Sequence, residues 1–235
     1  MILQRLISDV FAENCYLLAS SENRQAVVVD PGSGIAPHVA EALENHGLEL
    51  AAVLLTHGHP DHVWDAAEVA GDKPVYIAEP DAYRLDDPLV HQSPLTPVLR
   101  QVLPFPYRRP ENVQLLPPHL LEGGGAELVP GIPLRALPAP GHSEGSTIFF
   151  LGGEWDASTV EMAGAEPGTR SLVLTGDVLF RGSIGRTDLP GGDPEVMTWT
   201  LRTLRQVIAP DSMIFPGHGE ATTMRHELAT NPFLR

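Results

Sequence analysis

Most apolar residues of this chain fall in short runs rich in β-branched side chains, a pattern typical of buried strands. These runs predict strands at residues 2–7, 15–19, 26–29, 52–55, 75–77, 134–137, 147–151, 172–174 and 213–215. The strands occur in both halves of the chain, with helical segments between them. This order favours an α/β sandwich of two sheets covered by helices over a single parallel sheet.

Apolar residues at helical spacing predict two helices in the N-terminal half. One helix covers residues 35–43 and ends before Gly47. The other begins near Asp61 and continues to residue 70, which places His62 in its first turn.

A third helix is expected to begin at Asp193-Pro194-Glu195. An Asp can accept the first free amides, a Pro fits the first helical position, and a Glu complements the helix dipole. We expect the buried face of this helix to consist of Val196, Trp199, Thr203 and Val207.

Two stretches match neither a helix nor a strand. Residues 88–118 contain many prolines and the sequence Tyr107-Arg108-Arg109, and residues 153–170 are polar and rich in Gly. Long irregular segments are usually functional covers or flexible surface. We expect the first stretch to cover a site, because it holds aromatic and basic groups, and the second to be flexible surface.

Composition narrows the function classes. A chain of 235 residues with a hydrophobic fraction of 43% suits one globular domain over residues 1–235. The formal net charge of −15 argues against a nucleic-acid partner and against binding to an anionic membrane. The N-terminal residues lack the pattern of a signal peptide, and the single cysteine, Cys15, lies in a predicted strand. We therefore expect a cytoplasmic protein, while the oligomeric state stays open.

The sequence Thr56-His57-Gly58-His59-Pro60-Asp61-His62 directly follows a predicted strand and contains three of the ten histidines. Imidazoles and a carboxylate this close together lose hydration without compensation unless a cation lies among them. They cannot all reach one tetrahedral ion comfortably. The motif therefore favours two adjacent metal ions.

Further ligand candidates follow later strands. His142, Asp177 and His218 each come directly after a glycine at the end of a strand-like segment. Loops at strand ends of a layered α/β protein converge on one region. We expect these three side chains to join the residues of the 57–62 motif.

Taken together, His-x-His-x-Asp-His at 57–62 with His142, Asp177 and His218 resembles the metal signature of the metallo-β-lactamase superfamily. Pro-Gly-His-Ser at 140–143, Thr-Gly-Asp at 175–177, Gly-Arg-Thr-Asp at 185–188 and Pro-Gly-His-Gly at 216–219 resemble the glyoxalase II-like branch of that superfamily. The ending at 230–234 is similar to compact bacterial members. The resemblance spans nearly the whole chain and implies a four-layer αββα sandwich.

The resemblance also implies two divalent metal ions as cofactors, with zinc expected first and iron or manganese as alternatives. One ion would be held by His57, His59 and His142, and the other by Asp61, His62 and His218, with Asp177 as a bridge. Asp30 matches a family position that supports the metal loops through hydrogen bonds. An ordinary turn before Pro-Gly would favour an Asp there equally well.

Substrate recognition does not carry over from the family. Full-length glyoxalase II has a further helical domain that supplies basic residues for glutathione, whereas this chain ends shortly after His218. The candidates to supply positive charge for an anionic substrate are Arg181, Arg186, Arg108 and Arg109. Arg186 is equally suited to a structural pair with Asp188.

These features predict a metal-dependent hydrolase of S-acyl thiol thioesters, with a small-molecule thioester as its partner. Two ions about 3.5–4 Å apart can share a water whose pKa falls to near 7, which gives a hydroxide nucleophile. A thiol pKa of about 8.5 makes the thiolate an easy leaving group, so no Ser, Cys or Lys nucleophile is required. Asp61 is the candidate for proton transfer in addition to metal binding.

Other functions remain as alternatives. A persulfide dioxygenase, from a neighbouring family, shares Gly-Arg-Thr-Asp and uses one iron held by counterparts of His57, His142 and Asp177. A nuclease on the same metal centre is disfavoured by the acidic composition, and lactone or β-lactam hydrolysis stays open. A catalytically silent binding protein is disfavoured because every ligand-type residue is present.

Overall fold

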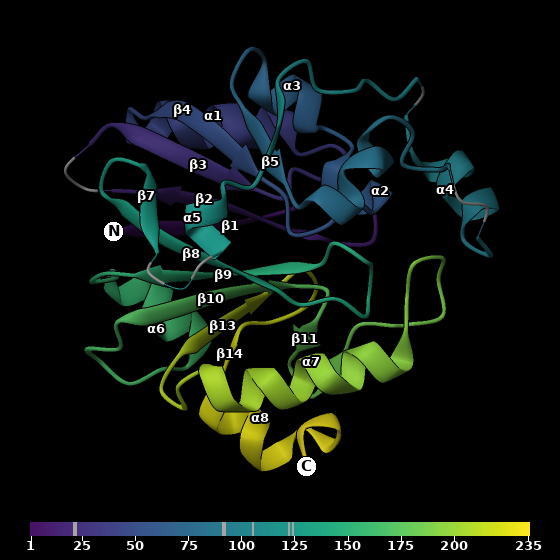
Figure 1. The fold of residues 1–235 in the computed structure, drawn as a ribbon. Helices are drawn as coiled ribbons and strands as arrows, with labels where there is room; N and C mark the ends of the chain where they lie inside the picture. Colours follow the sequence, from purple (N-terminus) through teal and green to yellow (C-terminus); the bar gives the residue numbers. More distant parts are fainter. Residues whose placement is uncertain (21–22, 91–92, 105, 122, 124) are drawn as a thin grey trace.

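Two sheets lie face to face in the computed structural model, and helices cover their outer faces (Figure 1). The structure describes residues 1–20, 23–90, 93–104, 106–121, 123 and 125–235. None of the helices in these ranges has both the length and the apolar character needed to cross a bilayer.

The N-terminal sheet has six strands in the order β1-β2-β3-β4-β5-β6. Their bounds are β1 Ile2–Ile7, β2 Asn14–Ala19, β3 Gln25–Val29, β4 Glu49–Leu54, β5 Val75–Ile77 and β6 Val113–Leu115. Strands β1 to β3 pair in antiparallel fashion, whereas β3 to β6 pair in parallel. The parallel strands therefore end at one edge of the sheet.

The C-terminal sheet also has six strands, in the order β14-β13-β10-β9-β8-β7. Their bounds are β7 Ala126–Val129, β8 Ile132–Pro138, β9 Thr147–Gly152, β10 Ser171–Gly176, β13 Met213–Pro216 and β14 Thr222–Thr223. Strands β10 and β13 are parallel, and the other pairs are antiparallel. A small hairpin of β11 Leu179–Phe180 and β12 Ser183–Ile184 lies beside this sheet.

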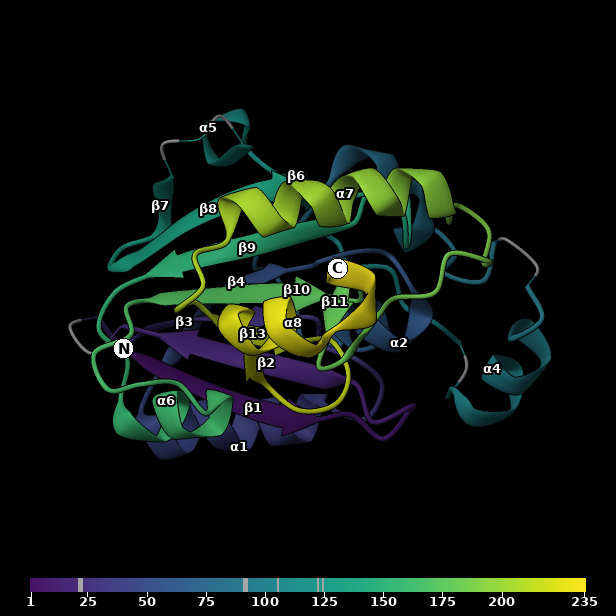
Figure 2. The ribbon, with the colours of Figure 1, turned by 90° about the horizontal axis from the view of Figure 1, so that it is seen from below.

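Helices occupy the outer faces and the connections. In the first half they are α1 Ala36–His46, α2 Pro60–Val63, α3 Ala66–Ala70, the 3-10 helix η1 Glu79–Leu85 and α4 Thr96–Val102. In the second half they are α5 Pro118–Leu121, α6 Ala157–Ala163, α7 Pro194–Val207, α8 Met224–Thr230 and the 3-10 helix η2 Pro232–Leu234. Figure 2 shows α7 and α8 lying across the C-terminal sheet, while α4 projects to one side.

Three hydrophobic clusters hold the four layers together. The cluster between the sheets joins Leu18 and Leu54 of one sheet to Phe149 and Phe215 of the other. A second cluster packs the N-terminal sheet on α1 and α3, and a third packs the C-terminal sheet on α7 and α8. This layering confirms the αββα sandwich. The single domain over 1–235 stays a prediction, with the shared core between the sheets in its favour.

All the strands expected from the apolar runs are present within a few residues of their predicted bounds, and Cys15 is buried in β2. The helix expected over 35–43 is α1, which ends at Gly47 in a left-handed conformation with φ 62°. The helix expected over 61–70 is instead two helices, α2 and α3. It breaks because Asp65 N donates to the Pro31 carbonyl at 3.1 Å rather than within a helix.

The expectation that residues 153–170 form flexible surface is wrong. Asp156 caps α6 by accepting a hydrogen bond from Thr159 N at 2.8 Å. Trp155, just before this helix, and Ala163, its last residue, belong to the core between the sheets. Apolar residues spaced within a polar stretch therefore form an edge of the core.

The buried face of α7 also differs from the prediction. Trp199 is 66% exposed and Val207 41% exposed, whereas the buried residues are Met197, Thr200, Leu201 and Leu204. The long aliphatic side chains fill the space against the C-terminal sheet, and Thr200 Oγ1 donates to the Pro140 carbonyl at 2.6 Å. The start at Asp193 is confirmed, since its carboxylate accepts from Glu195 N and Val196 N at 2.8 and 3.0 Å.

This orientation of α7 is testable by a pair of substitutions. Leu204→Ala removes a fully buried side chain and should lower the free energy of unfolding by about 2–5 kcal/mol. Trp199→Ala removes an exposed side chain and should cost less than about 1 kcal/mol. Urea unfolding monitored by circular dichroism measures both values, and the opposite ranking would contradict the orientation.

Candidate metal centre

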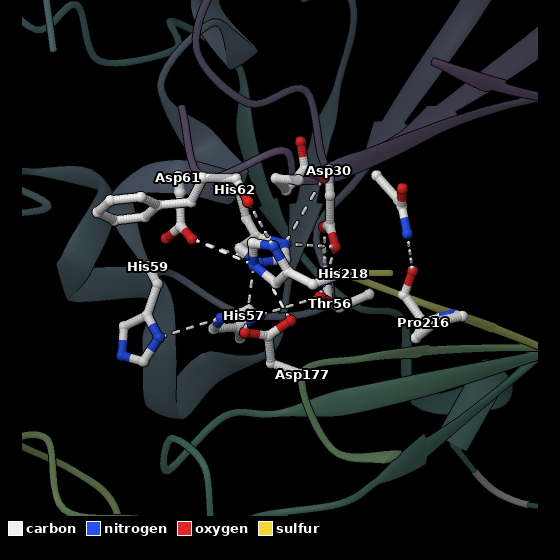
Figure 3. A network of polar contacts seen from close by, with 12 residues as sticks. Asp30, Thr56, His57, His59, Asp61, His62, Asp177, Pro216 and His218 are labelled. Atoms are coloured by element: carbon white, nitrogen blue, oxygen red, sulfur yellow. Dashed lines mark hydrogen bonds and ion pairs between the residues drawn. The ribbon is translucent and has the colours of Figure 1, made fainter. Parts of the chain in front are cut away.

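The ligand candidates lie where loops of the two sheets meet, and Figure 3 shows His57, His59, Asp61, His62, Asp177 and His218 gathered around one region. His57 and His59 are on the loop after β4, and Asp61 and His62 are in α2. The C-terminal sheet supplies the rest from the ends of three strands, namely His142 after β8, Asp177 after β10 and His218 after β13. The structure thus brings together every residue that the sequence placed at the metals.

Glycines before the ligands allow this close approach. A Cβ at Gly217 would lie 2.3 Å from Asp177 Oδ1 and 2.6 Å from His62 Cε1. Gly176 has φ 47°, and a Cβ there would lie 2.5 Å from Thr56 Oγ1. A side chain at Gly217 would displace the ligands, and one at Gly176 would displace Thr56, the residue next to His57.

The first group of donors consists of His57, His59 and His142, which are all buried. His59 Nδ1 lies 3.1 Å from His57 Nε2 and 2.9 Å from His142 Nε2. Two nitrogens that bind one tetrahedral zinc at 2.0–2.1 Å are about 3.3 Å apart. The spacing of these nitrogens therefore fits a single metal ion.

The second group consists of Asp61, His62 and His218. His218 Nε2 lies 3.3 Å from Asp61 Oδ2, and His62 Nε2 lies 4.0 Å from the same oxygen. His62 Nε2 is buried and has no hydrogen-bond partner within the described part of the protein. Orphaned buried polar atoms are rare and call for an explanation, and a cation would satisfy this one.

Asp177 lies between the two groups. Its Oδ2 atom is 3.6 Å from His142 Nε2 of the first group and 3.6 Å from His218 Nε2 of the second. Its Oδ1 atom is 3.3 Å from His62 Nε2 and is buried without a hydrogen-bond partner among the described residues. This placement suits a carboxylate that bridges two ions.

Hydrogen bonds to the opposite ring nitrogen orient four of the imidazoles. In each case an oxygen lies near Nδ1, so Nδ1 is the donor and the lone pair of Nε2 faces the centre. The acceptors are Thr56 Oγ1 for His57 at 3.0 Å, Asp30 Oδ2 for His62 at 3.0 Å, the Arg186 carbonyl for His142 at 2.8 Å and the Phe11 carbonyl for His218 at 3.2 Å. Phe11 adopts a left-handed conformation, with φ 57°, that places its carbonyl there.

Asp30 anchors the first metal loop, as the family resemblance implied. Its carboxylate accepts from Thr56 N at 2.7 Å and from Thr56 Oγ1 at 2.6 Å, in addition to His62 Nδ1. Asp30 itself has a left-handed backbone, with φ 52°, a conformation that Asp tolerates better than most residues. The simple turn role is therefore not its only one.

Asp81, in η1, is a positioning residue that the sequence did not reveal. Its buried carboxylate accepts from Gly58 N on the loop after β4 at 2.8 Å. It also accepts from Ser143 Oγ and Gly145 N on the loop of His142, both at 2.8 Å. Asp81 thus ties together the two loops that carry the first group of donors. Only these long-range contacts identify it.

Burial and neighbouring charges divide the histidines into two kinds. Burial lowers the pKa of His59 to about 3, with a further contribution from His142, and lowers the pKa of His57 as well. Burial also acts to lower the pKa values of His62 and His218, but nearby carboxylates outweigh it and raise both. Without metal, His57 and His59 are therefore neutral at neutral pH, whereas His62 and His218 hold a proton more strongly than a free imidazole does.

The pKa values of the two carboxylates in the centre are lowered. Burial acts to raise the pKa values of Asp61 and Asp177, but the surrounding histidines outweigh it and lower both. Both side chains are therefore ionised at neutral pH and available as ligands. Glu13 differs, because burial raises its pKa well above the ordinary value, and its Oε1 lies 3.8 Å from His62 Nδ1.

A cavity of about 200 Å³ opens above the two groups of donors. His59, Asp61, His142, Asp177 and His218 line its floor. Residues of the segment 88–99 form one wall, as expected for a cover, but Tyr107, Arg108 and Arg109 do not line the cavity. The cover is therefore mainly apolar, with Ser93 and Thr96 among its leucines, rather than basic and aromatic.

The two arginines proposed for the substrate have different positions. Arg186 lines the cavity and also pairs with Asp188 through Nε and Nη2 at 2.7 and 2.8 Å, so both expected roles are compatible with its place. Arg181 lies outside the cavity and pairs with Glu220, so it does not face a substrate held there, contrary to the expectation from the sequence. A third arginine, Arg84, lines the cavity and was not expected there.

Comparison with known proteins identifies the family. The model of the metallo-beta-lactamase superfamily matches residues 8–154, more than half of the chain. The chain belongs to the metallo-β-lactamase superfamily. Members of this superfamily typically bind divalent metals, in agreement with the His and Asp groups described above.

One superfamily relative is named hydroxyacylglutathione hydrolase GloC, from Haemophilus influenzae. It is 33% identical over 226 residues, which cover 95% of this chain and 93% of the relative. This confirms the resemblance to the glyoxalase II-like branch.

Solved structures of the superfamily match along the whole length. TTHA1623 in a di-iron-bound form is 31% identical with a TM-score of 0.73, and the match covers 98% of this chain and 100% of that one. BLEG-1, a B3 metallo-β-lactamase, is 26% identical with a TM-score of 0.75, and the match covers 99% of each chain. The fold is thus that of the superfamily.

Replacing Asp30 tests how the metal loops are held. Asp30→Asn keeps the shape and tolerates the left-handed backbone, but its amide offers one oxygen instead of two for Thr56 and His62. Metal affinity should fall by about 10- to 100-fold. Competition with a chromophoric chelator measures the affinity, and the exposed Asp211→Asn serves as the matched control. Equal affinities in the two variants would contradict the role of Asp30.

The two groups of donors should respond differently to pH. The raised pKa values of His62 and His218 mean that metal must displace protons from the second group, so its affinity should fall as pH is lowered. The loss should be about tenfold per pH unit for each proton displaced. His57 and His59 have lowered pKa values and no proton to lose near neutral pH. Calorimetric metal titration in two buffers of different ionisation enthalpy should show one binding event with clearly greater proton release. Equal release in both events would refute this.

Proposed function

We propose that this protein is a metal-dependent hydrolase of S-acyl thiol thioesters, similar to hydroxyacylglutathione hydrolase. The observation that carries the proposal is the pair of donor groups joined by Asp177 on the floor of a cavity. The GloC relative, which matches nearly the whole chain, supports the substrate class.

In this proposal His57, His59 and His142 would hold one divalent ion, Asp61, His62 and His218 would hold the other, and Asp177 would contribute to both. The chemistry that such a pair supplies when bound is a water that ionises near neutral pH and positive charge for a developing oxyanion. We propose zinc as the native metal. The di-iron form of TTHA1623 makes iron the competing choice.

The side chains of the protein supply orientation. Hydrogen bonds at Nδ1 fix four rings with Nε2 toward the centre, so little reorganisation is needed when substrate arrives. The cavity opens directly over these ligands and admits a carbonyl to them. Remote contacts such as those of Asp81 keep the loops at a constant separation.

Protons are handled mainly by Asp61. Its lowered pKa keeps the carboxylate ionised, so it can accept a proton at Oδ2 but does not arrive with one to donate. A thiolate of pKa about 8.5 leaves with little help from a proton donor. A thioester therefore suits this centre better than an amide, whose amine must be protonated as it leaves.

Metal content measured together with turnover of S-lactoylglutathione tests the proposal. We expect two metal ions per chain and turnover that depends on them. His59→Ala should lower kcat/KM by more than about a hundredfold, because loss of a metal ligand has a larger effect than loss of a residue that only hydrogen-bonds to a ligand. The exposed His38→Ala is the matched control and should resemble the parent.

Metal content and oxygen uptake of the same preparation distinguish this proposal from the persulfide dioxygenase alternative. One iron per chain with oxygen uptake driven by a persulfide would make the protein a persulfide dioxygenase and overturn the proposal. If the purified protein bound no metal and His59→Ala had the same activity as the parent, the protein would not be an enzyme of this class.

A further inference from the structure

The walls of the cavity differ in chemistry from its floor. One wall is formed by Leu89, Leu95 and Leu99, which come from the segment before and within α4. Phe11 and Leu189 complete the apolar lining on the other sides. The ligands of the proposed metals are thus at the base of a hydrophobic funnel.

The apolar wall packs against the hydrophobic residues beneath it. Leu89 and Leu99 belong to a hydrophobic cluster with Val10 and Trp64, and Leu95 packs against it. Trp64 Nε1 donates to the Pro104 carbonyl at 2.9 Å, just beyond the end of α4. The wall is therefore a preformed surface.

Most polar atoms of the wall side chains already have partners within the protein, although the buried Arg84 Nε has no hydrogen-bond partner among the described residues and only faces Asp81 Oδ1 at 3.5 Å. Ser93 Oγ accepts from Leu95 N at 3.2 Å, and Thr96 Oγ1 accepts from Ser93 N at 2.9 Å. Arg84 donates through Nη2 to Glu144 at 2.6 Å and to the Pro190 carbonyl at 3.0 Å. Polar groups of a substrate that entered this space would lose water and find most partners already engaged, which is unfavourable.

Charge also disfavours an anionic substituent. The two guanidinium groups on the walls, those of Arg84 and Arg186, are each paired with a carboxylate. The other arginines considered for an anionic substrate do not line the cavity. The chain as a whole carries a formal charge of −15, so an anion gains no long-range attraction.

We propose that the cavity selects thioesters whose acyl or thiol substituent is an uncharged aliphatic group, which packs against Leu89, Leu95 and Leu99. This inference rests on the proposed thioester hydrolysis and specifies its substrate class. It separates this protein from enzymes that recognise the charged glutathione tripeptide. Leu95 is the specificity-determining residue, because it lines the cavity and is only half-buried.

A series of thioesters tests the proposal. We would compare acetyl, butyryl and hexanoyl esters of N-acetylcysteamine, which is neutral, with the same esters of glutathione. Burial of a methylene corresponds to about fourfold in kcat/KM, so kcat/KM should rise by about that factor per methylene until the cavity is filled. At equal acyl length, the neutral thiol should be preferred to glutathione. The proposal would be overturned if kcat/KM did not change with acyl length. It would also be overturned if kcat/KM were higher for S-lactoylglutathione than for the butyryl and hexanoyl esters of both thiols.

Paired variants assign the effect to the wall. Leu95→Ser should reduce the rise in kcat/KM to less than about twofold per methylene of the acyl chain. Val98, three residues further along and within α4, is 44% exposed and outside the cavity, so Val98→Ser should keep the full gain in kcat/KM per methylene. An unchanged gain in Leu95→Ser would refute the assignment of this wall.

Binding without turnover separates failure of this inference from failure of the proposed function. Non-hydrolysable analogues with a methylene between carbonyl and sulfur can be titrated calorimetrically into the metal-loaded protein, which cannot cleave them. Their affinity should rise with aliphatic length by about fourfold per methylene, and Leu95→Ser should abolish the rise. If no thioester were hydrolysed but this rise were present, the cavity preference would stand and the reaction would be wrong. If affinity were independent of length, the cavity preference would be wrong whatever the reaction.

Discussion

The burial of imidazoles and carboxylates that face one another is the constraint on which the rest of the structure depends. His57 and His62 are almost completely buried, and the side chain of Asp177 is buried nearly as far. Such groups lose hydration on folding and repel one another when they carry like charges, so the arrangement is unfavourable in isolation. A cation between them reverses the balance, because it replaces water as the partner of each lone pair.

Each group of donors draws on both sheets. His57 and His59 come from the N-terminal half, whereas His142, which completes their group, comes from the C-terminal half. The same is true of the second group, with His218 from the C-terminal half. The hydrophobic core between the sheets therefore sets the distance between ligands, and metal binding in turn joins the two halves. Fold and metal centre depend on the same packing.

The sequence identified nine strands and the ligands because both have local signals, but it missed the short strands β6, β7, β11, β12 and β14. Apolar runs mark the strands, and a glycine before His218 or Asp177 marks a place where side chains meet closely. Contacts between distant segments have no such signal, so Asp81 and the position of Arg181 could not be predicted. The buried face of α7 was misjudged because two apolar stripes one residue apart were available, and only the facing sheet selects between them.

Anomalous diffraction from crystals of the metal-loaded protein tests the central claim most directly. The account predicts two peaks at the metal absorption edge, one among His57, His59 and His142 and one among Asp61, His62 and His218, with the Asp177 carboxylate in contact with both. A single peak, or ligands turned away from the metal, would contradict it.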